Sequence, residues 1–222
     1  MSSNLTLSWL TVTAVVAALA SIAAHYLAPA DSWLRFTFKP VATTLVLAVA
    51  LLPGTFLTSP YAAGICVGLL SSLIGDIFLM WPATHFQHGL LSFLVAHLCY
   101  WFAFGHGAFN VDALPLLAVM AVLTAFILHL LWPSVSRRLR IPIGVYSITT
   151  TGTATLAFSR HLQQPSRSST FAIAGALLLL ASDAALAIDR FRKPFPLARL
   201  VVRSTYYAGQ LLIAWSVPLN VL

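Results

Sequence analysis

Two aspartates of this chain lie inside long apolar runs, Asp76 in SSLIGDIFLM and Asp183 in LLLLASDAALA, in a sequence with five acidic residues and no Glu. A charged side chain at the centre of a bilayer costs about 2.5–3.5 kcal/mol on insertion scales. Such a residue therefore faces a protein interior, a water-filled cavity or a partner, and it usually has a function. Asp76 and Asp183 are the first candidates for catalytic residues.

Two carboxyl groups in different protonation states have the chemistry for acid-catalysed cleavage of an acetal-like or enol-ether bond. One carboxyl protonates the substrate, while the other stays ionised beside a cation or hydrogen-bond donor, orients water and stabilises an oxocarbenium ion. Glycosidases use a comparable pair. The structural alternative is that Lys39 or Arg203 neutralises each aspartate and the ion pair only holds helices together.

The composition predicts a polytopic membrane protein. The 222 residues are 59% hydrophobic and 8% charged, with a mean hydropathy of +0.91, whereas a soluble domain carries about a quarter charged residues. The net charge of +7 comes from Lys and Arg in short connections, as is typical of orientation signals. A nucleic-acid binder would show a continuous basic face, so we expect no nucleic-acid partner.

Eight segments have the roughly 20 mostly apolar residues that a transmembrane helix needs. We predict an all-α membrane protein, residues 1–222, formed by a single bundle of eight transmembrane helices with short connections, at 5–27, 34–52, 60–80, 87–108, 113–132, 141–160, 169–189 and 198–219. The first segment lacks the basic flank of a signal peptide and is expected to stay as a span. The connections are too short for a catalytic domain, so any active site must be built from the helices.

The basic residues predict the orientation in the cell (inner) membrane. Ten of the twelve lie in or beside the first, fifth and seventh connections: Arg35, Lys39, Arg137, Arg138, Arg140, Arg190, Arg192, Lys193, Arg199 and Arg203. By the positive-inside rule, the odd-numbered connections are cytoplasmic and both termini lie outside. Both aspartates then lie in the cytoplasmic half, at the depth of Lys39, His88, Ser92, Tyr146 and Arg203. Polar groups from six helices at one depth predict a site.

Two of the predicted helices carry small residues at helical spacing before their aspartate: Gly64, Gly68, Ser72 and Asp76 on one, Ala172, Ala176 and Asp183 on the other, with Ser182 beside Asp183. Such ridges let neighbouring helices approach closely, so both aspartates should point into the bundle. The ridges could serve packing within one chain or between two, and the oligomeric state is therefore not predicted.

The last predicted helix carries Arg203, Tyr207 and Gln210 on one face, with Tyr206 beside them. Arg203 could bind a phosphate bidentately or extend to the membrane interface, and Lys39 has the same two options. Thr150 and Thr153 share a face with Tyr146, although such hydroxyls more often bond to their own helix.

Histidines 85, 88, 97 and 106 first suggest a metal site. The last three are spaced nine residues apart, so neighbouring members face opposite sides of a helix. There is no HExxH motif, and we predict no metal; His97 is expected to be a buried hydrogen-bonding residue. Cys66 and Cys99 lack metal-ligand spacing and are expected to be packing residues.

Taken together, these segments resemble the YhhN-like lysoplasmalogenase family of integral-membrane proteins. The resemblance rests on Lys39-Pro40, Gly75-Asp76, the series Phe86, Gly89, Phe93, His97 and Tyr100, then Tyr146, Ser182-Asp183 and Tyr206-Tyr207-x-x-Gln210. It implies hydrolysis of the vinyl-ether bond of lysoplasmalogens to a fatty aldehyde and glycerophosphoethanolamine or glycerophosphocholine. The family's two important aspartates match Asp76 and Asp183.

The expected partners are a lysophospholipid substrate and membrane lipids, and the chemistry requires no metal or organic cofactor. Lys39 and Arg203 are candidates for the phosphate, and Tyr146, Tyr207, His97 and Ser182 for positioning the substrate or the carboxyls. The alternatives are a small proton-coupled transporter or lipid-binding membrane protein that uses the same carboxyls, and a metal-dependent lipid hydrolase. The sequence does not distinguish which aspartate is the acid.

Overall fold

The computed structural model describes residues 2–29, 32–107 and 109–221, and in these ranges all regular secondary structure is helical. The long helices are α1 (Ser2–Leu27), α2 (Trp33–Leu51), α3 (Pro60–Phe78), α4 (Pro82–Phe104), α5 (Leu114–Leu131), α6 (Arg137–Gln163), α7 (Arg167–Phe191) and α8 (Ala198–Trp215). Short 3-10 helices η1 (Val111–Ala113) and η2 (Trp132–Ser134) flank α5, and α9 (Pro218–Val221) follows α8. Each predicted segment thus corresponds to one long helix.

The helix ends differ from the prediction most at α4 and α6. Helix α4 begins at Pro82 and continues through a kink at His85, where φ −115° and ψ 17° are not helical. The prediction began this helix after the kink, at residue 87. The terminal turns of helix α6 are polar, and a prediction from apolar residues therefore missed them at both ends.

Five of the described helices are long and apolar enough to cross a membrane: Leu5–Leu27, Trp33–Leu51, Pro60–Phe78, Val111–Ser134 and Arg167–Phe191. Helices α4, α6 and α8 are not among them, and each carries polar side chains among its apolar residues. In α6, for example, Thr149, Thr150, Thr151 and Thr153 are buried. An all-helical fold is therefore confirmed, whereas eight membrane crossings remain a prediction.

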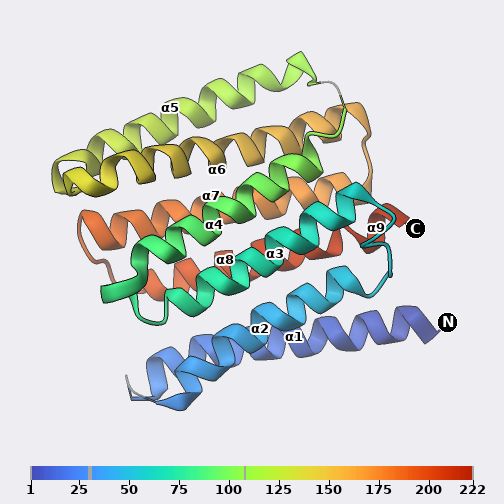
Figure 1. Cartoon of the computed structure of the whole chain (residues 1–222), viewed down its shortest axis with the longest axis horizontal. Coiled ribbons are helices and arrows are strands. Elements are labelled where there is room, and N and C mark those ends of the chain that lie inside the picture. The colour runs from blue at the N-terminus through green and yellow to red at the C-terminus, as the bar shows by residue number, and fades with distance from the viewer. Residues whose placement is uncertain (1, 30–31, 108, 222) are drawn as a thin grey trace.

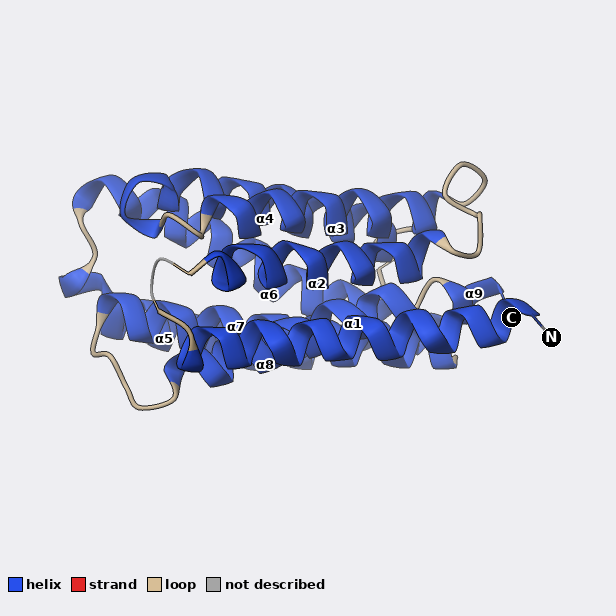
Figure 2. Cartoon of the chain, turned by 90° about the horizontal axis from the view of Figure 1, so that it is seen from below, coloured by secondary structure: helices blue, strands red, loops and turns tan. Residues whose placement is uncertain are grey.

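The helices run roughly parallel, with α5 and α6 at one edge of the bundle and α1 and α2 at the other (Figure 1). The turned view separates α2, α3 and α4 from α1, α7 and α8 (Figure 2). The beginning of α1 and helix α9 lie at the same end. The opposite end carries the α1–α2, α3–α4, α5–α6 and α7–α8 connections, and we call it the basic end because the ten clustered basic residues named above lie in or near these connections.

Glycines allow the closest helix approaches around the site. A Cβ at Gly68 of α3 would lie 2.3 Å from Cε1 of Tyr100 of α4, and the Tyr100 side chain is fully buried. On α7, a Cβ at Gly175 would lie 2.7 Å from the carbonyl oxygen of Gly209 of α8. The small-residue ridge predicted for α3 is confirmed at Gly68, and the Gly175–Gly209 approach adds one that was not predicted.

Gly68→Ala is expected to destabilise the protein, because over-packing a well-filled core costs about 1–3 kcal/mol of unfolding free energy. Gly144→Ala is the matched control: this α6 glycine has no atom within 4 Å of an added Cβ, and alanine favours a helix over glycine by up to about 1 kcal/mol. Thermal unfolding of the purified variants in detergent measures the difference. Equal midpoint temperatures would contradict the close α3–α4 contact.

Candidate active site

A cavity of about 960 Å³, here called the main cavity, is lined by side chains from all eight long helices. Both aspartates line it, together with most of the other predicted site residues: Lys39, Tyr146, Ser182, Arg203 and Tyr207. His97 does not line it but contacts Asp183. Polar residues at one depth on different helices thus share a cavity, as expected, although His88, at the same predicted depth, has an exposed side chain.

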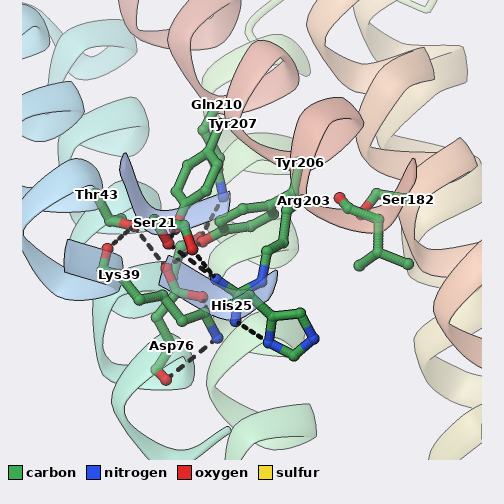
Figure 3. Close-up of polar contacts among 12 residues, drawn as sticks. Ser21, His25, Lys39, Thr43, Asp76, Ser182, Arg203, Tyr206, Tyr207 and Gln210 are labelled. Carbon is green, nitrogen blue, oxygen red and sulfur yellow. Dashed lines mark hydrogen bonds and ion pairs between the residues drawn. The ribbon is translucent and has the colours of Figure 1, made fainter. Parts of the chain in front are cut away.

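Asp76, in the last turn of α3, is only 1% exposed and is surrounded by donors (Figure 3). Its Oδ1 lies 3.0 Å from Nζ of Lys39. Its Oδ2 accepts hydrogen bonds from Oγ1 of Thr43 at 2.6 Å and from the hydroxyl of Tyr206 at 2.8 Å. An ammonium and two hydroxyls are the groups that stabilise the charged form of a carboxyl group.

The partners of Asp76 come from two other helices. Lys39 and Thr43 are one helical turn apart on α2 and therefore share a face, while Tyr206 is on α8. The ion pair with Lys39 is the one that the structural alternative required. It does not exclude a catalytic role, because the carboxylate also lines the main cavity.

Asp183, near the middle of α7, has different partners. Its side chain is 23% exposed, and its Oδ2 lies 3.5 Å from Nε2 of His97 and accepts a 2.9 Å hydrogen bond from the hydroxyl of Tyr146. Among the described residues, the only ion-pair partner of its carboxyl group is this histidine. No fixed cation therefore balances a charge on Asp183.

His97 lies between Asp183 and Thr153 in a chain of polar contacts. The Nδ1 atom of His97 lies 3.1 Å from Oγ1 of Thr153, which also lies 3.0 Å from the carbonyl oxygen of Thr149. If Thr153 donates its hydrogen to that carbonyl, Nδ1 must donate to Thr153 and therefore carries a hydrogen. Nε2 then contacts Asp183 favourably only if a proton lies between Nε2 and Oδ2. If Thr153 donates to Nδ1 instead, the imidazole hydrogen is on Nε2. In both arrangements a proton between Nε2 and Oδ2 would be favourable.

Arg203 and Tyr207 connect α8 to α1. The guanidinium of Arg203 donates to the carbonyl oxygen of Ser21 at 2.8 Å and to its hydroxyl at 3.0 Å, and lies 3.5 Å from Nδ1 of His25 (Figure 3). The hydroxyl groups of Tyr207 and Ser21 share a 2.9 Å hydrogen bond. Arg203 therefore extends toward α1 rather than to the membrane interface.

Ser182 has a contact between helices: its hydroxyl donates to the carbonyl oxygen of Val202 at 2.9 Å, which joins α7 to α8. Thr43 and Tyr206 contact Asp76 and were not among the predicted site residues. The spacing of Thr43 one turn after Lys39 was a signal for the first. Tyr206 was noted as a neighbour of the predicted face of α8 and as part of the family resemblance, without a role at the site.

A model of the YhhN family matches residues 34–217. The chain belongs to the YhhN family. It is 37% identical over 167 residues to lysoplasmalogenase TMEM86A of Bos taurus, covering 73% of this chain and 68% of that protein. It is 36% identical over 148 residues to lysoplasmalogenase TMEM86B of Homo sapiens, covering 67% and 60%. It is also 28% identical over 211 residues to the uncharacterized membrane protein YhhN of Escherichia coli O157:H7, covering 95% and 99%.

No solved structure matches this YhhN-family chain. The similarity to a membrane protein and the apolar helices both indicate a multi-pass membrane protein. Within the described ranges, the YhhN-family fold brings together no group of three or more His, Cys, Asp or Glu side chains that could hold a metal ion. Cys66 is buried against the apolar core, as expected of a packing residue.

Proposed function

We propose that this protein is a lysoplasmalogenase-type hydrolase that cleaves the vinyl-ether bond of lysoplasmalogens to a fatty aldehyde and glycerophosphoethanolamine or glycerophosphocholine. The observation that carries the proposal is one cavity lined by two carboxyl groups with different partners: Asp76 beside a lysine, and Asp183 beside His97. The similarity to relatives named lysoplasmalogenase supports the choice of bond.

In the proposed mechanism, the Asp183–His97 pair is the general acid. Its shared proton is transferred to the β-carbon of the vinyl ether, and the electron pair of the carbon–carbon double bond forms the new C–H bond. The product is an oxocarbenium ion at the ether oxygen and its neighbouring carbon. The ionised carboxylate of Asp76 stabilises this positive charge electrostatically, in a cavity with largely apolar walls.

Water then attacks the carbon that carries the ether oxygen, oriented by Asp76. One proton of the water returns to the Asp183–His97 pair, which restores the acid and leaves a hemiacetal. The hemiacetal collapses to the aldehyde and the alcohol of the glycerol backbone. Overall, one water molecule is consumed, and no metal or organic cofactor takes part.

The proposal puts the head group at the basic end and the active site in the cytoplasmic half of the inner membrane. Five basic side chains of the main cavity support this arrangement: Arg35, Lys39, Arg190, Arg199 and Arg203. A phosphate is attracted to such a group of cations. Lys39 and Arg203 remain the proposed phosphate contacts, with Tyr146, Tyr207, His97 and Ser182 positioning the substrate or the carboxyls.

The deciding experiment compares two substrates that differ in one double bond. The purified protein is incubated with a lysoplasmalogen or with its saturated-ether analogue, and released aldehyde is measured. We expect aldehyde from the vinyl ether alone, because only a carbon–carbon double bond next to oxygen can accept the proton. Chelators should have no effect. Absence of turnover together with proton-coupled uptake into liposomes would instead favour a transporter.

A further inference from the structure

A second cavity, of about 390 Å³, lies between α4, α5 and α6, and we call it the tail pocket. Thr124 and Leu128 of α5 line both this pocket and the main cavity. The walls of the two spaces therefore share these residues. Among the described residues that line the tail pocket, none is charged.

Helix α5 forms a continuous wall along both cavities. Residues from Met120 to Leu131, at helical spacing, line the main cavity, and residues from Leu117 to Leu128 line the tail pocket. From Leu117 to Leu131 the wall is about 21 Å long at 1.5 Å per residue. This exceeds the hydrocarbon depth of one leaflet, about 15 Å, so the wall is long enough for a lipid chain.

The hydroxyl groups in the tail pocket are satisfied by the protein. Oγ1 of Thr124 and Oγ1 of Thr151 share a 2.8 Å hydrogen bond between α5 and α6. Thr124 lines both cavities. Oγ1 of Thr155 donates to the carbonyl oxygen of Thr151 at 3.0 Å. Apolar cavities whose walls offer water few partners stay dry and bind apolar ligands. The tail pocket thus has the lining of a hydrocarbon site.

The charges of the connected cavities match an amphiphile with one chain. The basic side chains of the main cavity belong to residues near the basic end of the bundle, whereas the uncharged tail pocket reaches Leu117, close to the start of α5. Helix α5 is also the outermost helix at its edge of the bundle, and of its residues only Leu131 is buried. A chain from the surrounding bilayer could reach the cavities beside this helix.

We propose that the single hydrocarbon chain of the lysolipid substrate runs from the main cavity past Thr124 into the tail pocket, and that the pocket sets the preferred chain length. This inference rests on the proposed function for the identity of the substrate. The vinyl-ether bond then lies beside Asp76 and Asp183, and the chain end lies among Leu117, Ala121 and Gly152.

The variant that tests the pocket is Ala121→Trp, with Ala118→Trp as its matched control. Both alanines are exposed residues of α5, but only Ala121 lines the tail pocket. Filling the pocket should lower kcat/KM for long-chain substrates by at least about tenfold, since each methylene that an apolar pocket excludes changes kcat/KM by roughly 10–200-fold. Activity on a short-chain substrate should stay within about twofold of the wild type.

A photolabelling arm does not depend on catalysis. The probe is a saturated-ether lysolipid with a diazirine at the chain end, crosslinked to the full-length protein and mapped by mass spectrometry. We expect labelled peptides from α5 and α6, around residues 117–125 and 148–156, that disappear when unlabelled lysolipid competes. A diazirine placed near the ether oxygen should label residues of the main cavity instead.

The proposed path of the chain would be overturned if the chain-end probe labelled all lipid-facing helices and unlabelled lysolipid did not reduce this labelling. Equal chain-length profiles for Ala121→Trp and Ala118→Trp would overturn it as well. If unlabelled lysolipid reduced the labelling of the tail pocket but the protein released no aldehyde, the chain site would be supported and the proposed function overturned. The two failures are therefore distinguishable.

Discussion

Asp183→Asn is expected to lower kcat for aldehyde release by about 10²–10⁴-fold, the usual contribution of a positioned general acid. Asparagine keeps the shape of the side chain and can still accept the hydrogen bond from Tyr146, but it cannot hold the proton shared with His97. Because no lysine or arginine of the described residues pairs with Asp183, the variant should keep the thermal stability of the wild type. The assay is aldehyde release from a lysoplasmalogen, beside thermal unfolding in detergent.

The control for Asp183→Asn is Asp112→Asn, the same substitution at an exposed residue of η1, which should leave both activity and stability unchanged. His97→Gln should lower the rate as well and alter its pH dependence, since the proton would then be held by the carboxyl group alone. Near-normal turnover by Asp183→Asn would show that the general acid is another group.

Asp76→Asn is expected to abolish turnover and also to destabilise the protein. The rate falls because a neutral amide cannot stabilise the oxocarbenium ion. Stability falls because Asp76 and Lys39 form a largely buried ion pair, with side chains 2% and 14% exposed. Removing one partner of a buried pair typically costs about 3–5 kcal/mol, since it leaves the other charge uncompensated.

The double variant Asp76→Asn, Lys39→Met separates these two effects. Removing the lysine charge as well should restore much of the thermal stability, while aldehyde release stays absent. Recovery of activity together with stability would mean that Asp76 acts only through folding, which is the structural alternative of a helix-joining ion pair. Near-normal aldehyde release by the Asp76→Asn single variant would also refute a direct role of Asp76.

The sequence predicted the helices well, and the identity of individual contacts less well. Helix α8 is an example: the sequence favoured Tyr207 on the face of Arg203, but Tyr206 donates to Asp76 and Tyr207 pairs with Ser21. Adjacent residues of a helix point about 100° apart. Which of them meets α3 depends on the rotation of α8 about its axis, and that rotation is fixed by contacts such as Gly175–Gly209.

The sequence by itself determined an all-helical membrane protein with two aspartates inside apolar segments, because segment length and residue composition can be read along the chain. The tertiary structure decided how the two aspartates differ. Asp76 meets Lys39, Thr43 and Tyr206, while Asp183 meets Tyr146 and His97. These partners come from other helices, so the difference between a carboxyl group beside a lysine and one beside a histidine exists only once the helices pack.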